Sequence, residues 1–442
     1  MEPLLYGAAT SAVQIEGATR ADGRGRSIWD RFWDTPGAVR NGETGELACD
    51  FYHRYRDDLD LAAELGVDAF RFSVAWPRVI PDGGRRVNER GLDFYDHLVD
   101  ELLARSLEPV LTLYHWDLPL PLEDAGGWPS RRTVDAFVRF SEAVVGRLGD
   151  RVRYWITQNE PRVPGFLGYG TGEHAPGRRS RADALAAVHH LLLAHARAVP
   201  VIRAGAPDAQ VGISIDPTLA SPASGRLADV LAARRVDGER IRWYLDPLFG
   251  RGYPDDLLEL YGPDAPPVRR HDLDDIAVPI DFLGINFYER QVVGAGPGGE
   301  PRVVHQDGSR YTEMGWEVSP GALAGVIARI DDEYSPRSFW VTENGAAFDD
   351  VRTHDGSGHD PERAEYVRDH VRAVQLARLA GHPVDAYFVW SLLDNFEWAL
   401  GYSKRFGLVF VDYPTLERVP KQSFHAFREE IARSRAQAAA AR

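Results

Sequence analysis

The sequence predicts a closed (β/α)₈ barrel, an α/β fold in which eight parallel strands alternate with helices. Short runs rich in β-branched and aromatic residues alternate with longer amphipathic patterns from one end of the chain to the other. This alternation is repeated eight times, the number that a barrel of this class needs to close. A doubly wound open sheet is the alternative fold. It requires a glycine-rich phosphate loop after its first strand, whereas the segment AATSAVQIEG stands at that place here.

The expected strands are short β-rich runs. They are predicted at residues 6–9, 69–73, 110–114, 154–157, 211–214, 281–286, 339–342 and 386–390. The segments between them carry apolar residues at helical spacing. Residues 92–105 place one apolar stripe at Leu92, Tyr95, Leu98, Val99, Leu102 and Leu103. Residues 133–148 repeat the pattern with Val134, Phe137, Val138, Val144 and Leu148. Gly66 and Gly381 are expected to end two further helices.

The chain is much longer than a minimal barrel. It has 442 residues, whereas the barrel itself needs about 250, so long insertions are expected. They are predicted at residues 41–49, 117–128, 164–179, 294–308 and 349–360. Because many of these segments follow strand ends, they should build walls around one face of the barrel. We expect a single barrel domain with extended loops over residues 1–436 and a frayed tail over residues 437–442.

Composition and charge limit the cellular locations and the binding partners that we expect for this protein. The net charge of −15 argues against nucleic acid and against an anionic membrane surface as partners. No run of about 18 apolar residues is free of charges, and the first residues lack the pattern of a signal peptide. The single cysteine, Cys49, permits no intrachain disulfide and suits a reducing compartment. A cytoplasmic protein is therefore expected, and its oligomeric state stays open, a homo-oligomer included.

Two short acidic motifs follow predicted strands. TQNEP at residues 157–161 places Glu160 where one strand ends, and VTENG at residues 341–345 places Glu343 where another ends. A buried apolar strand that ends in a carboxylate is a costly way to place a charge. The cost is explained if the two carboxylates meet across a cleft and act together. Cleavage of a glycosidic bond needs such a pair, one as proton donor and one as nucleophile or base.

The two motifs are part of an ordered series that covers nearly the whole chain. The series comprises GAATSAVQIEG, DFYHRYRDDLDL, RFSVAWPRVIP, TLYHWDLP, TQNEP, FLGYGTGEHAPG, DFLGINFY, WVTENG and WSLLDNFEWALGYSKRFGL. In this series the chain resembles glycoside hydrolase family 1, the β-glucosidase family. The resemblance implies an exo-acting enzyme that hydrolyses the terminal β-glucosyl residue with retention of configuration.

The resemblance also implies roles for individual residues. Glu160 is expected to be the acid/base and Glu343 the nucleophile, with Arg71 and Tyr288 in contact with the nucleophile. Asn159 is expected to donate to the sugar 2-hydroxyl. The sugar-binding positions carried over from the family are Gln14, His115, Asn159, Glu397 and Trp398, with Trp390 as the platform beneath the sugar.

The implied mechanism is a double displacement. It suits carboxyl groups about 5–5.5 Å apart. Arg71 is expected to hold Glu343 ionised, and the anion of Glu343 is expected to raise the pKa of Glu160. No HExxH, CxxC or EF-hand pattern is present in the sequence, and the mechanism needs no metal or other cofactor.

The expected substrate is a neutral β-glycoside, with glucose as the favoured sugar. Relatives that hydrolyse 6-phosphoglycosides resemble this chain but carry serine, lysine and tyrosine where Glu397, Lys404 and Phe406 stand here. An anionic Glu397 beside O6 would repel a phosphate. A β-galactosidase, a β-fucosidase and a transglycosylase remain alternatives, and a non-catalytic sugar-binding protein is the alternative from another class.

Structural roles are the alternatives for several of these residues. Arg71 is otherwise the partner of some other barrel acid, and His115 and Gln14 otherwise support their neighbours. His174 is expected to brace a loop. Trp316 is expected either in a wall or beside the leaving group.

Overall fold

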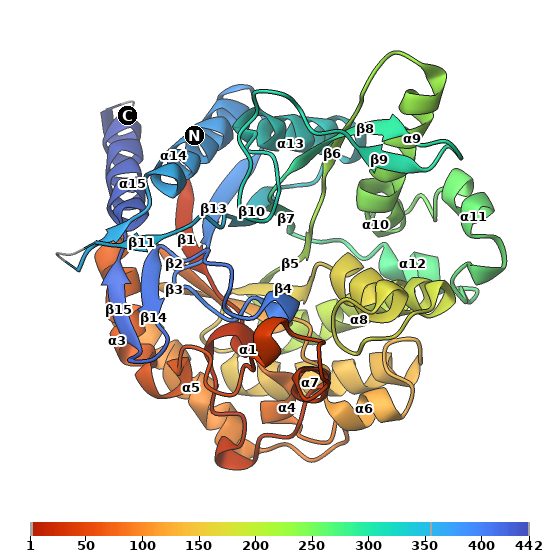
Figure 1. Ribbon diagram of the computed structural model, residues 1–442. Helices are drawn as coiled ribbons and strands as arrows, with labels where there is room; N and C mark the ends of the chain where they lie inside the picture. Colours follow the sequence, from red (N-terminus) through yellow and green to blue (C-terminus); the bar gives the residue numbers. More distant parts are fainter. Residues whose placement is uncertain (1–2, 354–355, 441–442) are drawn as a thin grey trace.

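The computed structural model describes residues 3–353 and 356–440, and eight of its strands close into a barrel (Figure 1). Around the barrel the strand order is β1-β13-β10-β7-β5-β4-β3-β2, and all neighbours are parallel. The strands are β1 (Leu5–Ala9), β2 (Ala69–Ser73), β3 (Glu108–Tyr114), β4 (Tyr154–Asn159), β5 (Gln210–Ile215), β7 (Phe282–Phe287), β10 (Phe339–Asn344) and β13 (Val384–Trp390). The prediction of a (β/α)₈ barrel is confirmed.

The two strands that carry the acidic motifs extend further than predicted. β4 continues to Asn159 and β10 to Asn344, two residues beyond the predicted ends. Their pairing is irregular there. The register of β4 against β5 shifts between Ile156 and Asn159, and that of β10 against β7 shifts between Val341 and Glu343. Such irregularities re-aim side chains and are common next to active sites.

Helices surround the barrel (Figure 1). The long ones are α3 (Phe51–Leu65), α5 (Glu89–Ala104), α7 (Arg132–Leu148), α8 (Arg181–Gly205), α13 (Pro320–Tyr334), α14 (Pro361–Leu379) and α15 (Gln422–Ala440). The short ones are α1 (Ala12–Ile15), α2 (Ile28–Trp33), α4 (Trp76–Val79), α6 (Leu120–Asp124), α9 (Leu227–Asp237), α10 (Trp243–Leu248), α11 (Asp255–Tyr261) and α12 (Asp272–Ile276). Gly66 ends α3 in the left-handed conformation, with φ of 79°, as the sequence predicts.

Small sheets form part of the loops that follow the strands. β6 (Leu219–Pro222), β8 (Arg290–Ala295) and β9 (Pro301–Val303) form one, β11 (Val351–Arg352) and β12 (Gly358–His359) the second, and β14 (Val409–Asp412) and β15 (Glu417–Pro420) the third. The glycine-rich run at residues 294–299 lies at the turn between β8 and β9, as expected of a turn. Residues 354 and 355 of the predicted insertion lie outside the described residues.

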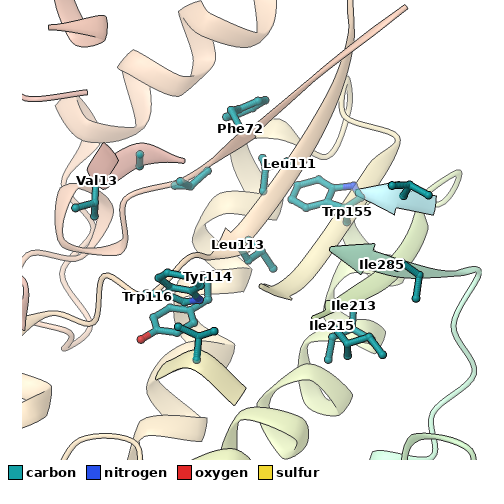
Figure 2. Close-up of a cluster of buried hydrophobic side chains, with 14 of the residues drawn as sticks. Val13, Phe72, Leu111, Leu113, Tyr114, Trp116, Trp155, Ile213, Ile215 and Ile285 are labelled. Carbon is teal, nitrogen blue, oxygen red and sulfur yellow. The ribbon is translucent and has the colours of Figure 1, made fainter. Parts of the chain in front are cut away.

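Alternate residues of each strand face two different cores. Phe72, Leu111, Leu113, Trp155, Ile213 and Ile285 belong to the large cluster between the strands and the surrounding helices (Figure 2). A second, smaller cluster includes Ala69, Val110, Ile156, Phe282, Trp340, Ala386 and Phe388. Because side chains alternate between the two faces of a strand, this second cluster fills the inside of the barrel. The barrel is therefore packed below the strand ends at which the acidic motifs stand.

α8 is long and apolar enough to span a membrane by length and composition alone, but 83% of its most apolar window is buried inside the protein. It is apolar on several faces because it packs against α7, β4 and α12 at once. One expectation from the sequence is corrected: the predicted frayed tail from residue 437 is wrong for residues 437–440, since α15 continues to Ala440. Residues 441 and 442 lie outside the described residues.

Candidate active site

A cleft of about 320 Å³ opens at the C-terminal ends of the barrel strands. Glu160 and Glu343 both line it, although 183 residues separate them in the sequence. The other predicted site residues that line it are Gln14, His115, Tyr288, Trp390, Glu397, Trp398 and Phe406. Arg71 and Asn159 are buried directly beneath, where they contact residues of the cleft. The barrel thus brings together every residue to which the resemblance gives a role in the site.

Glu343 is held at both carboxylate oxygens. Arg71 Nη1 donates to Oε1 over 2.6 Å, and the Tyr288 hydroxyl donates to Oε2 over 2.6 Å. Arg71 is fully buried and is itself fixed, since it also donates to Asn159 Oδ1 over 2.6 Å and to the Thr342 carbonyl over 3.0 Å. These contacts fix the orientation of the carboxylate and place one positive charge against it.

Glu160 stands on strained backbone at the end of β4. Its φ of 48° lies in the left-handed region that favours glycine, and its amide donates to the Ser214 carbonyl of β5 over 2.8 Å. Asn286 of β7 donates to Glu160 Oε1 over 2.6 Å and to Asn159 Oδ1 over 3.0 Å. Trp116 and Trp398, which also line the cleft, have left-handed φ values of 75° and 51°. Positive φ values therefore recur in the residues that shape this site.

The environments of the two glutamates differ in a way that separates their proton affinities. Burial raises the pKa of Glu160 well above its ordinary value, and the charges of Asp216 and Glu343 raise it further. Burial also raises the pKa of Glu343, but the charge of Arg71 and the hydrogen bond from Tyr288 oppose that rise. Glu160 therefore keeps its proton to higher pH than Glu343 does. This order of the two pKa values suits a pair in which Glu160 is the acid and Glu343 is the anion.

A second polar group lies at the Gln14 side of the cleft. Gln14 Nε2 donates to Glu397 Oε2 over 3.2 Å and to Asn395 Oδ1 over 3.0 Å. His115 contacts the amide of Asn159 through Nε2, 3.1 Å away. Burial lowers the pKa of His115 well below its ordinary value, and the charge of Arg71 lowers it further, so the ring is neutral. The group presents amide, imidazole and carboxyl atoms to one region of the cleft.

Aromatic rings flank these polar atoms. The Trp398 ring lies 4.5 Å from that of Trp116, and the Trp390 ring is stacked 6.1 Å from that of His115. Phe406 meets Tyr288 edge to face at 6.2 Å. Flat apolar faces beside hydrogen-bonding groups suit a ligand that is apolar on one side and polar at its edges, as a pyranose ring is.

Glu397 was expected to be an anion, but its carboxyl group is mainly protonated at neutral pH. Burial raises the pKa of Glu397 to about 8, with a further contribution from the charge of Glu343.

Lys404 donates to the Glu313 carbonyl over 2.6 Å and pairs with its carboxylate at 3.3 Å. The lysine therefore joins two loops at the rim of the cleft.

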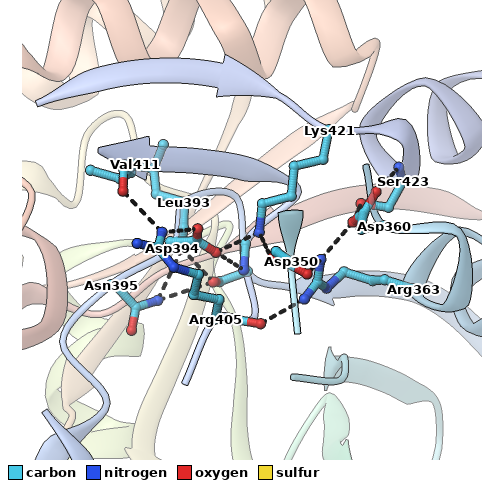
Figure 3. Close-up of polar contacts among 12 residues, drawn as sticks. Asp350, Asp360, Arg363, Leu393, Asp394, Asn395, Arg405, Val411, Lys421 and Ser423 are labelled. Carbon is cyan, nitrogen blue, oxygen red and sulfur yellow. Dashed lines mark hydrogen bonds and ion pairs between the residues drawn. The ribbon is translucent and has the colours of Figure 1, made fainter. Parts of the chain in front are cut away.

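The loop after β13, which carries Glu397 and Trp398, is anchored by buried charges (Figure 3). Asp394 accepts hydrogen bonds from Lys421 over 2.7 Å and from Arg405 over 2.6 Å. Lys421 is fully buried and also pairs with Asp350, in the loop after β10. Removing one member of such a buried network leaves an unpaired charge, which is strongly destabilising. The network ties the loop that follows Glu343 to the loop that carries Glu397.

Close backbone contact joins the same two loops at Gly345. A Cβ atom built at this position would lie 1.7 Å from the carbonyl oxygen of Trp390. The glycine of the VTENG motif is thus required because no side chain fits there.

Sequence reasoning missed several residues that line the cleft, among them Asn286, Arg162, Asp216, Arg240 and Glu289. Asn286 lies in a motif that was recognised, DFLGINFY, and its place at a strand end was the available signal. Arg162 and Asp216 line the cleft and form an ion pair at 2.5 Å, and Arg240 lies near them. No motif marks this charged group, because its members come from separate segments. His174 and Trp316 also line the cleft.

Comparison with known proteins agrees with this geometry. The model of glycosyl hydrolase family 1 matches residues 1–436. Beta-glucosidase A of Thermotoga maritima is 44% identical over 425 residues, which cover 96% of this chain and 95% of that protein. A bifunctional beta-D-glucosidase/beta-D-fucosidase of Bifidobacterium breve is 42% identical, with 97% of each chain covered.

Solved structures agree over the same length. The β-glucosidase from Thermotoga maritima in complex with glucoimidazole has a TM-score of 0.96 and 43% identity, covering 98% of this chain and 99% of that chain. The same enzyme in complex with deoxynojirimycin also has a TM-score of 0.96, with 98% of each chain covered. The chain therefore belongs to glycosyl hydrolase family 1.

Proposed function

We propose that this protein is a retaining, exo-acting β-glucosidase that hydrolyses neutral β-glycosides by double displacement. One observation carries the proposal. A carboxyl group that keeps its proton, Glu160, shares a cleft with a carboxylate held by Arg71 and Tyr288. The relatives named β-glucosidases, and the relative solved with glucoimidazole, support glucose as the sugar.

In the first displacement, Glu343 attacks the anomeric carbon while Glu160 gives its proton to the glycosidic oxygen. The bond between that oxygen and the anomeric carbon breaks, and a glycosyl ester forms on Glu343. Arg71 and Tyr288 orient the attacking carboxylate through their hydrogen bonds to its two oxygens. General acid catalysis of this kind contributes about 10²–10⁴-fold to the rate.

In the second displacement, Glu160 acts as a base. Ester formation removes the charge of Glu343, which is one of the causes that raise the pKa of Glu160. The pKa of Glu160 then falls, so its carboxylate can take a proton from water as the water attacks the anomeric carbon. The ester bond breaks, and glucose leaves with the β configuration that it had in the substrate.

The sugar is proposed to lie over Trp390, with Gln14, His115 and Glu397 on its hydroxyl groups. Trp398 and Phe406 close the apolar sides, and Asn159 is assigned to the 2-hydroxyl. What supports these assignments is that all of these residues except Asn159 line the cleft with Glu343 and carry complementary atoms, and that Asn159 lies beneath it in contact with His115. Hydrogen bonds to the 2-hydroxyl strengthen toward the transition state.

A fucosidase activity is a second candidate. The observation that favours it is the name of the Bifidobacterium breve relative, which includes both sugars. Fucose lacks a hydroxyl at carbon 6, and Glu397, which is expected beside that carbon, is mainly neutral at pH 7. A neutral carboxyl group there loses less on binding the deoxy sugar than a buried anion would.

We also propose that the protein works in a reducing compartment such as the cytoplasm and acts on small, neutral substrates. Its single cysteine and its net charge of −15 support this proposal.

The experiment that tests the function is a proton NMR time course with the purified chain and 4-nitrophenyl β-D-glucoside. β-Glucose should appear first and α-glucose only later, through mutarotation. Early α-glucose would contradict the retaining mechanism. Absence of glucose, together with turnover of the fucoside or galactoside, would reassign the sugar, and binding of glucose with no turnover of any β-glycoside would point to a sugar-binding protein.

A further inference from the structure

A short hairpin between β9 and α13 lies at the edge of the cleft. It comprises residues 311–317, and an antiparallel bridge joins its two ends. Inside it the Thr312 amide donates to the Trp316 carbonyl over 2.9 Å. Met314 and Trp316 line the cleft, so the hairpin forms part of its wall. We call residues 311–317 the rim hairpin.

Three contacts hold the rim hairpin in place. The Glu313 amide donates to the carbonyl of Ala347, in the loop after β10, over 2.9 Å. Lys404 Nζ, from the loop after β13, donates to the Glu313 carbonyl over 2.6 Å and to its carboxylate over 3.3 Å. Arg290, the first residue of β8, donates to both carboxylate oxygens of Glu317 over 2.8 Å. The hairpin is therefore tied to segments that follow β7, β10 and β13.

The contact of Lys404 with the backbone is the stronger part of its interaction. The Glu313 side chain is 54% exposed, and an ion pair with an exposed carboxylate contributes little. The hydrogen bond to the carbonyl is shorter and comes from a charged donor whose side chain is only 15% exposed. Lys404 thus holds the main chain at the tip of the rim hairpin.

The rim hairpin packs against the tyrosine that contacts the proposed nucleophile. The rings of Trp316 and Tyr288 lie 5.2 Å apart, and Phe406 lies 6.2 Å from each of them. The Tyr288 hydroxyl donates to Glu343 Oε2 over 2.6 Å. Because Tyr288 contacts both rings, their positions fix the direction of its hydroxyl. A continuous series of contacts therefore leads from Lys404 to Glu343.

The hydrogen bond from Tyr288 affects the chemistry of Glu343 as well as its orientation. It lowers the pKa of Glu343 and so opposes the effect of burial. A Tyr288 ring that moves away from this position would let that pKa rise. The other groups that act on Glu343 are Arg71, Asn286, Glu160 and Glu397.

We infer that Lys404 is a positioning residue for hydrolysis: it holds the rim hairpin so that Trp316 stays against Tyr288 and the Tyr288 hydroxyl stays on Glu343. This inference rests on the proposed function, because it takes Glu343 as the nucleophile. It assigns a role in the reaction to an ion pair at the edge of the cleft.

The test is the pH dependence of kcat/KM for 4-nitrophenyl β-D-glucoside in Lys404→Met. The acidic limb should move to higher pH by about half a unit, because a weaker hydrogen bond from Tyr288 lets the pKa of Glu343 rise. On the limb itself this shift lowers kcat/KM about threefold. A purely structural ion pair would leave the limb in place.

Glu313→Gln is the matched control. It removes the carboxylate that pairs with Lys404 but keeps the carbonyl to which Lys404 donates. The acidic limb should therefore stay at its wild-type position. A shift in this variant equal to that in Lys404→Met would overturn the assignment to the backbone contact.

A double-mutant cycle tests the route through Tyr288. In Tyr288→Phe the hydroxyl is absent, so adding Lys404→Met should move the limb no further. If the lysine acted directly on Glu343 through its charge, the shift would persist in the Tyr288→Phe background. A persistent shift would thus overturn the inference.

An unmoved limb in Lys404→Met would also overturn the inference. If that variant does not fold, Trp316→Leu replaces it in the same cycle. The limb should again move to higher pH, and only while the Tyr288 hydroxyl is present; an unmoved limb has the same negative meaning. If the wild-type chain does not hydrolyse 4-nitrophenyl β-D-glucoside at any pH, the proposed function itself fails, which is a distinct result.

Discussion

Arg71 and Glu343 meet in the barrel at 2.6 Å although 272 residues separate them in the sequence. Both side chains are buried, with exposed fractions of 0% and 3%. A buried ion pair contributes little net stability, because the loss of hydration offsets much of the attraction. Its main consequence here is electrostatic: the cation opposes the effect of burial on the Glu343 carboxyl group. The ion pair therefore affects the protonation and reactivity of Glu343 more than it affects the free energy of unfolding.

Replacing Arg71 by methionine should move the acidic limb of the pH profile of kcat/KM to higher pH. Without the guanidinium the pKa of Glu343 rises, so the reactive anion forms only at higher pH. At pH 6 we expect kcat/KM to fall by at least about 100-fold, because Glu343 also loses its orienting contact. The measurement is kcat/KM for 4-nitrophenyl β-D-glucoside from pH 4 to pH 9.

Arg78→Met is the control for this prediction. Arg78 is also fully buried and pairs with a carboxylate, Glu16, at 2.9 Å, but neither residue lines the cleft. Its replacement should lower stability without moving the acidic limb. An unmoved limb in the Arg71 variant would contradict the role that we assign to Arg71.

The roles of the two glutamates can be separated by azide rescue. Glu343→Ala should abolish hydrolysis, and azide should restore turnover by attacking the face of the sugar that Glu343 no longer occupies. The product should be the α-glycosyl azide, since this single displacement inverts the configuration. The product is identified by proton NMR.

Glu160→Ala gives the complementary result. Hydrolysis of substrates with poor leaving groups should fall by about 10²–10⁴-fold, and activated aryl glucosides should lose less in the first displacement. Azide should then give the β-glycosyl product, because it attacks the glycosyl ester on Glu343. Exchange of the two azide products between the variants would exchange the two roles.

The barrel and most of the site could be predicted from the sequence because the signals for them are local. Each strand is a short apolar run between helical patterns, and Glu160 and Glu343 stand at strand ends inside recognisable motifs. The charged group of Arg162, Asp216, Arg240 and Glu289 was missed because its meaning depends on which loops meet above the barrel. The protonation state of Glu397 was missed for a related reason, since burial sets it and the residue's own identity does not reveal burial.

Replacing Asp216 by asparagine should move the alkaline limb of the pH profile to lower pH. The negative charge of Asp216 is among the causes that raise the pKa of Glu160, so its removal lets Glu160 lose its proton earlier as the pH rises. Arg162 then lacks its 2.5 Å partner, and its uncompensated charge lowers the pKa of Glu160 further. Activity should therefore be lost at a lower pH than in the wild-type enzyme.

The measurement is the pH dependence of kcat/KM, with Asp281→Asn as control. Asp281 pairs with Arg203 at 3.2 Å and does not line the cleft, so its replacement should leave the alkaline limb in place. A limb that stays in place in the Asp216 variant would show that this carboxylate does not act on Glu160.

Discrimination against 6-phosphoglucosides should depend on pH through Glu397. The pKa of this carboxyl group is raised to about 8, so it becomes an anion mainly above that pH. We expect the ratio of kcat/KM for a glucoside to that for its 6-phosphate to increase between pH 7 and pH 9. The reason is that only the ionised carboxyl group repels the phosphate. The same ratio in Glu397→Gln and Glu397→Ser, which cannot ionise there, should not increase, and a parallel increase in these variants would refute the charge argument.

Asp117 offers a test of stability outside the cleft. It is 1% exposed, and no side chain donates a hydrogen bond to either carboxyl oxygen in the described part of the chain. Burial raises its pKa from 3.8 to about 8, against an opposing effect of Arg24. Between pH 4 and pH 8 the folded protein therefore binds a proton that the unfolded chain has released. Because the folded state binds more protons, its stability falls as the pH rises through this window.

Asp117→Asn should remove this dependence, since an amide stays neutral at every pH. The variant should be more stable than the wild-type protein at pH 7, by up to about 4 kcal/mol, because each pH unit above 4 contributes about 1.4 kcal/mol. The advantage should shrink toward zero near pH 4, where the wild-type carboxyl group is protonated in both states. Urea unfolding of both proteins at pH 5 and pH 7 measures the difference. If the difference in free energy of unfolding between the two proteins is the same at both pH values, Asp117 remains ionised in the folded protein and another group compensates its charge.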